Sequence, residues 1–339
     1  MQHEIHEGRL LDKKGNLTEP GFAYRLVKEY RRRDIKAGAL RIKEWDYYYI
    51  GNAHFGIALT IDDNSYMSLV SATFLNFDEK WEKTKSVMGF LTLGKVGFPS
   101  SSAGGITKIK GKGFNFVFNN DGENRHLICD MENLDRGKRF HVDAVLSETN
   151  RDSMVIATPF SKKRHFYYNQ KINLLEATGK VTFGDASYSL DGSLGVLDWG
   201  RGVWTYKNTW YWSSLNARYE GKRIGFNLGY GFGDTSAATE NMFFYDDQAF
   251  KLEDVRFNIP KDANGQECYM GDWTFTSSDG TINLTFKPTL DRHSATSLLV
   301  LKSIQHQVFG KFSGYIYANS EKIEFDDLLG FAEKVINYW

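Results

Sequence analysis

Apolar and polar residues alternate with a period of two along many stretches of the chain. The alternation is clearest over residues 224–232, 281–286 and 303–317. A period of two is typical of β-strands that bury one face. Helical spacing is confined to Leu26–Arg33 and Asp326–Val335, which predict short helices. The chain is therefore expected to be built almost entirely of strands.

Turn signals such as Asp279-Gly280 separate these strands, and only five prolines interrupt them. Strands joined by short turns form antiparallel meanders, which hide their edges by closing into barrels or packing as sandwiches. We therefore expect an all-β fold of packed antiparallel β-barrel or sandwich domains with few short helices. The length of 339 residues and a polar stretch at 150–158 predict one domain over 1–155 and a second over 156–339.

Aromatic residues make up 15% of the chain, with 18 Tyr, 25 Phe and 8 Trp. This excess suits pleated, half-buried sheets and a pocket that binds an apolar or ring-bearing small molecule. The 42 basic and 42 acidic residues balance, so the chain has no charge excess for nucleic acid or for an anionic membrane.

The N-terminus is polar, and no apolar run approaches the roughly 18 residues that span a membrane. We therefore expect a soluble, cytoplasmic protein. The two cysteines, Cys129 and Cys268, are too few for a disulfide framework, and the eight histidines are scattered without metal-ligand spacing. The sequence therefore predicts no metal and no cofactor.

The densest group of unusual residues lies between Leu197 and Asn241. It contains four of the eight tryptophans. Trp fills volume in barrel cores, which explains part of this enrichment. It does not explain the interleaved ionisable residues, because such groups are rarely buried unless they are paired or functional. We therefore expect a pocket to which this segment contributes Trp204, Trp210, Trp212, Asp198, Arg201, Asp234, Glu240 and Asn241.

Asp198, Glu240 and Arg201 are the candidate catalytic residues. A carboxyl group beside aromatic rings is poorly solvated, so its pKa rises and it can act as a general acid. A nearby guanidinium would lower the pKa of a second carboxyl and give the two groups different roles. The alternative for Arg201 is an ion pair with Asp198 that holds a loop.

One face of the predicted strand at 224–232 carries almost no side chains, because it is formed by Gly225, Asn227, Gly229 and Gly231. Such a face leaves room either for a ligand, with Asn227 as its polar group, or for closely packed backbone.

Four residues outside this segment are further candidates for ligand binding. Trp45 and Tyr168 lie in charged, aromatic stretches, and His306 and Gln307 lie on a predicted strand. A lone histidine in a strand is more often structural, although it can also titrate near neutrality. The sequence has no GxSxG, GxxxxGK[ST] or HExxH motif.

The sequence resembles a family catalogued as a domain of unknown function, number 2804, along nearly its whole length. The motifs that carry the resemblance are Lys43-Glu44-Trp45-Asp46, Ala157-Thr158-Pro159-Phe160, Phe166-Tyr167-Tyr168-Asn169, Asp198-Trp199-Gly200-Arg201-Gly202-Val203-Trp204, Gly231-Phe232-Gly233-Asp234, Thr239-Glu240-Asn241 and His306-Gln307-Val308-Phe309-Gly310.

More remotely, the sequence is similar to the lipocalin-related superfamily of carotenoid hydratases, tocopherol cyclases and fungal Diels–Alderases. This resemblance implies two packed lipocalin-like β domains. It also implies chemistry in which a carboxylic acid protonates an isoprenoid alkene or the pocket folds a polyene for cyclisation. Asp198-Trp199-Gly200 is similar to the Asp beside a Trp-Gly pair in the hydratases, whereas Thr239-Glu240-Asn241 has no counterpart there.

Three hypotheses for function follow. The first is a cofactor-independent hydratase, cyclase or isomerase that acts on an apolar substrate, isoprenoids included, with Asp198 or Glu240 as general acid. The second is a carbohydrate-active enzyme, a glycoside hydrolase or lyase, that uses the two carboxylates. The third is a non-catalytic lipid or pigment binder. Trp rings that lie flat along an open groove would favour the second, and rings that line an apolar cavity would favour the first or third.

Overall fold

The computed structural model of the chain describes residues 2–149, 152–298 and 301–339. Within these residues the fold is almost entirely β, as the alternation predicts, with no α-helix and two short 3-10 turns, η1 (Arg32–Asp34) and η2 (Ala39–Arg41). None of the described residues forms a helix long and apolar enough to cross a membrane. Cys129 and Cys268 are both free.

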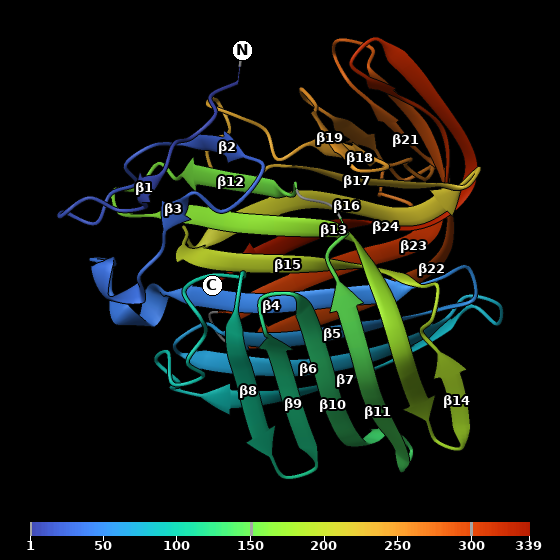
Figure 1. Cartoon of the computed structure of the whole chain (residues 1–339), viewed down its shortest axis with the longest axis horizontal. Helices are drawn as coiled ribbons and strands as arrows, with labels where there is room; N and C mark the ends of the chain where they lie inside the picture. The colour runs from blue at the N-terminus through green and yellow to red at the C-terminus, as the bar shows by residue number, and fades with distance from the viewer. Residues whose placement is uncertain (1, 150–151, 299–300) are drawn as a thin grey trace.

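The first large sheet is antiparallel, and its strands lie between Gly21 and Val203. Its strands are β2 (Gly21–Ala23), β4 (Lys43–Gly51), β5 (Phe55–Asp63), β6 (Met67–Asn76), β7 (Trp81–Phe90), β8 (Gly105–Gly111), β9 (Phe114–Asn120), β10 (Asn124–Asp135), β11 (Lys138–Ser147), β12 (Met154–Pro159), β13 (Phe166–Phe183), β14 (Ala186–Ser189) and β15 (Leu194–Val203). Their order is β7-β6-β5-β4-β15-β13-β11-β10-β9-β8, and β12 and β14 also pair with β13. In Figure 1, β8 to β11 cross the β4 to β7 region at a steep angle, which is how this sheet curls round on itself.

The second large sheet is also antiparallel, and its strands lie between Lys207 and Tyr338. Its strands are β16 (Lys207–Tyr219), β17 (Lys222–Tyr230), β18 (Met242–Tyr245), β19 (Gln248–Lys251), β20 (Arg256–Asn258), β21 (Trp273–Thr276), β22 (Ile282–Leu298), β23 (Leu301–Ala318) and β24 (Glu321–Tyr338). Their order is β19-β18-β17-β16-β24-β23-β22-β21-β20. A separate short parallel pair joins β1 (Gly8–Arg9) to β3 (Lys28–Glu29) near the N-terminus.

Each curled sheet is a half-barrel that encloses its own apolar core, so the architecture is that of two lipocalin-like domains. Phe74, Phe116 and Trp199 belong to the first core, and Phe226 and Trp273 belong to the second. The alternation of side chains along each strand separates these core positions from the positions on its other face.

The two sheets meet through the outward faces of β4 and β15 on one side and β16, β23 and β24 on the other. Tyr49 lies at the centre of this contact, with its ring centroid 5.3 Å from that of Phe309 and 5.7 Å from that of Phe331. The chain changes sheet between Val203 and Lys207, whereas the boundary predicted at residue 155 falls within β12 of the first sheet.

Both predicted helices are wrong. Leu26–Arg33 contains β3 and the beginning of η1, and Asp326–Val335 lies within β24. Asp327 has a φ of 59°, and the register of β23 against β24 shifts beside it, between Phe312 and Gly314. A bulge of this kind adds residues to one strand and breaks the period of two, so the apolar positions on either side imitate helical spacing.

Candidate active site

Between the two sheets lies a cavity of ≈ 170 Å³, here called the aromatic chamber. Strands β4, β5, β13 and β15 of the first sheet form one wall, and β16 and β24 of the second form the other. Its aromatic lining residues are Trp45, Tyr167, Trp204, Trp210, Trp212, Phe232 and Trp339. Its polar lining residues are Thr60, Asp62, Asn64, Lys171, Asp198, Glu240 and Glu333. The four carboxyl groups come from places far apart in the sequence.

The alternation of β15 decides which residues of its motif reach the chamber. Asp198 lines the chamber, while Trp199 packs in the core of the first sheet. Gly200 follows on the chamber side, and a Cβ there would lie 2.0 Å from a ring carbon of Trp45. The glycine therefore lets the Trp45 ring lie against the backbone of β15 and form part of the chamber wall.

Asp198 is held by two donors from β13. The Lys171 ammonium lies 2.7 Å from Asp198 Oδ2, and the Asn169 amide donates to Oδ1 at 2.6 Å. Lys171 also lies 3.8 Å from the centre of the Trp212 ring, a cation–π contact. The chamber thus contains one charged pair that is set directly against an aromatic wall.

Glu240 enters the chamber from the segment between β17 and β18. The side-chain amide of Asn227 donates to the Glu240 backbone carbonyl at 2.7 Å, and the backbone N–H of Gly229 donates to Asn241 Oδ1 at 2.7 Å. A Cβ on Gly229 would lie 2.6 Å from Glu240 Oε1. The glycine face of β17 therefore makes room for the Glu240 carboxyl, and Asn227 and Asn241 position the segment that carries it.

Burial raises the pKa of the Glu240 carboxyl to about 7. The positive charge of Lys171 opposes this rise, and the negative charge of Asp198 adds to it. A carboxyl group with a pKa near 7 is partly protonated at neutral pH, which is what a general acid requires.

The remainder of the glycine face of β17 is filled by protein. At Gly225 a Cβ would lie 3.0 Å from the Leu174 side chain of β13. Asn227 accepts a hydrogen bond of 2.7 Å from the Trp212 indole N–H, which fixes that ring in the chamber wall. The glycines on this face therefore allow close packing of neighbouring residues and leave room for the groups that fix the chamber residues.

Two further carboxyl groups line the chamber, Asp62 on β5 and Glu333 on β24. Burial raises the pKa of Asp62 to about 7 and also raises the pKa of Glu333. Glu333 accepts hydrogen bonds of 3.1 Å from the Trp210 indole N–H and from the Gln305 amide. Sequence reasoning missed both groups, because Glu333 lay in a predicted helix and Asp62 in an otherwise ordinary strand.

A larger cavity of ≈ 510 Å³, here called the polar vestibule, adjoins the chamber and shares Trp45, Asp198 and Glu333 with it. Several of its other lining residues are polar: Ser71, Thr84, Ser86, Arg292, Gln305 and Gln307. Gln307, a predicted binding residue, donates to the Tyr47 hydroxyl and to Glu333, both at 3.3 Å. The site thus has an aromatic inner part and a polar outer part.

Arg201 lies away from the chamber. It is fully buried on the opposite face of β15 from Asp198, where its guanidinium donates to Asp46 at 3.1 Å and lies 4.2 Å from the Trp199 ring. The expected pairing of Arg201 with Asp198 is therefore absent, because residues three apart on a strand point to opposite faces. Arg201 belongs to the core of the first sheet.

The same alternation separates Tyr168 from Tyr167 on β13. The Tyr168 hydroxyl donates to the Lys28 carbonyl at 3.1 Å within the first sheet's core, and Tyr167 lines the chamber in its place. Lys171, which was not among the predicted site residues, shares the chamber face with Tyr167. The period of two along 166–171 is the signal that finds both.

Asp234 and His306 also lie outside the chamber. Asp234 is exposed and accepts a hydrogen bond of 3.0 Å from the backbone of Ser236, so it closes a turn. His306 lies 2.7 Å from the Asp291 carboxylate, and its ring stacks at 3.7 Å on Tyr269. These three contacts are structural and involve no chamber residue.

Comparison with solved structures finds three proteins that superpose on most of this chain. A protein from Nitrosomonas europaea provisionally named AttH superposes with a TM-score of 0.53 at 11% identity, over 87% of this chain and 92% of that one. Kievitone hydratase from Nectria haematococca gives a TM-score of 0.49 at 13% identity, over 87% and 88% of the two chains. CghA gives 0.41 at 8% identity, over 98% and 97%. The likeness to AttH shows a shared fold.

No curated protein matches the sequence significantly. One family model does match, and it covers residues 2–339. The resemblance carried by the motifs around Asp198 and Glu240 is thereby confirmed, and the chain belongs to the family described as Domain of unknown function (DUF2804).

Proposed function

We propose that this protein is a cofactor-independent enzyme of the hydratase, cyclase or isomerase type, which acts on an apolar small molecule by general acid catalysis. The observation that carries the proposal is the Glu240 carboxyl, whose pKa is raised to about 7 by burial within aromatic walls. The ion pair between Lys171 and Asp198 lines the same chamber. A protonated acid and a carboxylate in one aromatic-walled chamber are the two partners that proton addition and removal require.

In this mechanism Glu240 donates its proton to a carbon–carbon double bond of the substrate, which leaves a carbocation. The faces of the surrounding rings, among them Trp204 and Trp212, stabilise that cation by cation–π interaction. If Asp198 then takes a proton from the neighbouring carbon, the double bond moves and the product is an isomer. If water instead adds to the cation and gives up a proton to the Glu240 carboxylate, the product is a hydrate and the acid is restored.

The two cavities indicate the shape of the substrate. Small-molecule sites commonly measure about 300–1,000 Å³, and the chamber of ≈ 170 Å³ is smaller than that while the vestibule of ≈ 510 Å³ is within it. A substrate that fits both has an apolar reacting part in the chamber and a more polar part in the vestibule. Gln305 and Gln307 supply hydrogen-bonding groups for that polar part.

The arrangement of the rings favours an apolar molecule over a sugar. A carbohydrate platform presents flat ring faces along an open groove. In the chamber only Trp45 and Tyr167 are stacked among the ring pairs of the described residues, at 15°, and the other contacting rings pack edge to face. The interplanar angles are 82° between Trp45 and Trp204, 71° between Trp204 and Phe232, and 69° between Trp210 and Phe232.

Native mass spectrometry of the purified full-length protein tests the first half of the proposal. We expect a co-purified apolar molecule, whose mass and fragmentation then identify the substrate or product class. A sugar bound in its place would overturn the apolar assignment and favour the carbohydrate-active alternative.

Turnover of the identified molecule tests the second half. Glu240→Gln is expected to lower kcat by about 10²–10⁴, which is the usual contribution of a general acid, and Asp198→Asn is expected to lower it as well. Asp234→Asn, a carboxyl of the same segment that lies outside the chamber, is the matched control and should keep full activity. Undiminished turnover by both chamber variants would exclude the mechanism, and binding without turnover by the wild type would identify a non-catalytic binder.

A further inference from the structure

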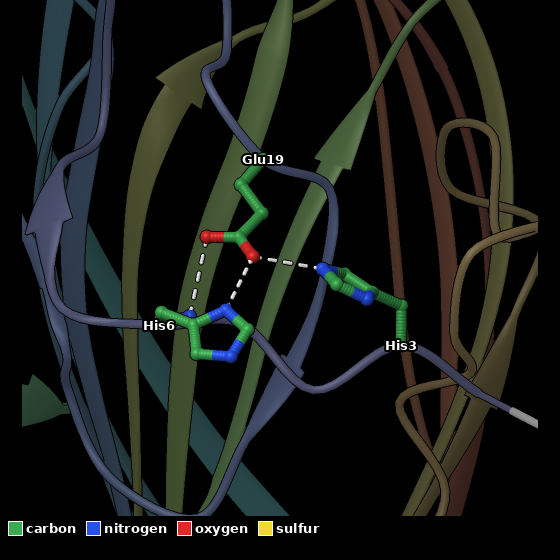
Figure 2. Close-up of side chains that lie close together, drawn as sticks. All are labelled: His3, His6 and Glu19. Carbon is green, nitrogen blue, oxygen red and sulfur yellow. Dashed lines mark hydrogen bonds and ion pairs between the residues drawn. The ribbon is translucent and has the colours of Figure 1, made fainter.

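Near the N-terminus, three side chains that can bind a metal converge on one point, as Figure 2 shows. His3 Nε2 and His6 Nδ1 each lie 2.8 Å from the same carboxylate oxygen, Oε1 of Glu19. All three ligand atoms lie within 4.8 Å of one another. Within the described ranges this is the only such group of three, and it lies outside the chamber and the vestibule.

The backbone fixes the two histidines in place. The His3 N–H donates to the Ala237 carbonyl at 2.9 Å, and the His3 carbonyl accepts from the Phe22 N–H at 2.9 Å. Ile5, between the two histidines, is buried in the first sheet's core. The segment that carries both histidines is therefore held against β2 and residue 237 by backbone hydrogen bonds. The two imidazoles need little further ordering to bind a metal.

The Glu19 carboxylate is oriented by its other oxygen. Lys28 Nζ lies 2.5 Å from Oε2, and the His6 backbone N–H donates to Oε2 at 3.2 Å, so Oε1 is turned toward the two imidazoles. The carboxylate is therefore held by partners of the kind that orient metal ligands in known sites.

We infer that His3, His6 and Glu19 bind a divalent transition metal of the zinc class. Two imidazoles and one carboxylate form a ligand set that zinc accepts, and water completes its tetrahedral shell. Bonds of about 2.1 Å place tetrahedral ligand atoms about 3.4 Å apart, so each nitrogen has to move only slightly from the Glu19 oxygen. The His3 and His6 side chains are 48% and 80% exposed, so an ion from solution reaches them directly.

The site is linked to the segment that carries Glu240. Gln2 Oε1 accepts a hydrogen bond from the Thr239 backbone N–H at 2.8 Å, and the His3 backbone N–H donates one to the Ala237 carbonyl. A metal that ties His3 and His6 to Glu19 therefore also holds residues 237–239 in place. Binding is expected to order this segment, directly before Glu240.

Zinc titration of the full-length, chelator-treated protein tests the site. Calorimetry is expected to show one equivalent of zinc bound to the wild type, with affinity weakened more than about tenfold by His3→Ala, His6→Ala or Glu19→Gln. His54→Ala removes an exposed histidine that also lies beside a carboxylate, at 3.1 Å from Asp78, and should bind zinc as the wild type does. Circular dichroism checks that each variant is folded. Equal zinc affinity in the wild type and in a folded His3→Ala/His6→Ala variant would overturn the proposal.

Hydrogen exchange with and without zinc tests the link to the Glu240 segment. We expect slower exchange of the amides of residues 237–241 when zinc is bound, and no change in the His3→Ala/His6→Ala variant. Zinc binding that leaves exchange over 237–241 unaltered in the wild type would overturn the link. Neither readout depends on catalysis, so the outcome is independent of the enzymatic activity proposed above.

Discussion

Lys171 and Asp198 lie directly opposite each other on β13 and β15, and the Lys171 ammonium lies 2.7 Å from the Asp198 carboxylate. The two side chains are only 4% and 10% exposed. A charge pair in such surroundings is costly to form and costlier still to break, because one charge is then left buried without its partner. The pair therefore explains how a carboxylate can be kept among tryptophans.

The first prediction follows from that pairing. Lys171→Met should lower the free energy of unfolding by about 3–5 kcal/mol at neutral pH, because Asp198 is left unpaired. The loss should shrink as the pH is lowered, since a protonated carboxyl carries no uncompensated charge. Urea denaturation at several pH values measures both effects.

The double variant Lys171→Met/Asp198→Asn is the control for this experiment. Because it removes both charges, it should recover most of the stability that the single variant loses. A Lys171→Met protein as stable as the wild type would show that the ion pair contributes nothing to the free energy of unfolding.

A second prediction concerns the pH dependence of stability. The folded pKa of Glu240, about 7, lies above the ordinary value of 4.5. Between these values the folded state binds more protons than the unfolded chain, so the Glu240 contribution to stability falls as pH rises through this window. Glu240→Gln removes that cost and should stabilise the protein by about 1–3 kcal/mol more at pH 8 than at pH 4.5.

Asp234→Asn serves as the comparison, because hydrogen bonds from Ser236 lower the pKa of Asp234. That carboxyl is ionised in the folded state throughout this pH range, so its removal should give no gain at pH 8. Denaturant unfolding of both variants across this range decides the matter, and a Glu240→Gln stability difference that does not change with pH would contradict the prediction.

The fold was largely accessible from the sequence, and its exceptions have local causes. Strict alternation over 303–317 predicts the strand that the structure shows as part of β23. The wrong helix at Asp326–Val335 arose from the bulge at Asp327, whose left-handed backbone breaks the period of two. Such a bulge depends on register with a neighbouring strand, and one strand's residues do not encode that register.

The site was accessible only in part. Alternation within Asp198-Trp199-Gly200-Arg201 already implies that Asp198 and Arg201 point to opposite faces, so this error was avoidable. The meeting of Asp198 with Lys171 was not predictable in the same way, because it depends on the register of β15 against β13. Glu333 reaches the chamber through the packing of one sheet on the other, which no local pattern specifies.

A third prediction tests the close approach of Trp45 to Gly200. Gly200→Ala places a methyl group where a Trp45 ring carbon lies 2.0 Å away, so it should destabilise the fold by about 1–3 kcal/mol through overpacking. It should also weaken ligand binding, because the ring is pushed into the chamber. Thermal unfolding and ligand titration measure the two effects.

A Cβ at position 200 would clash only with the Trp45 ring among its three nearest contacts, so changing Trp45 provides the control. In a Trp45→Leu background the added methyl group finds space, so Gly200→Ala should cost much less there than in the wild type. Gly38→Ala, where the nearest atom is 4.0 Å away, should be almost neutral. Equal costs of Gly200→Ala in both backgrounds would show that the Trp45 ring is not what the glycine accommodates.

The last prediction separates Arg201 from the chemistry of the chamber. Arg201 and Asp46 form an ion pair buried in the first sheet's core, so Arg201→Met should cost about 3–5 kcal/mol of stability and Arg201→Met/Asp46→Asn considerably less.

Because the guanidinium faces away from the chamber, the pH at which the activity of folded Arg201→Met protein is half-maximal should equal that of the wild type. Lys171→Met is the contrasting variant, because the Lys171 charge opposes the rise in the pKa of Glu240, and its removal should move the profile to higher pH. A displaced profile in Arg201→Met would return this residue to the catalytic site.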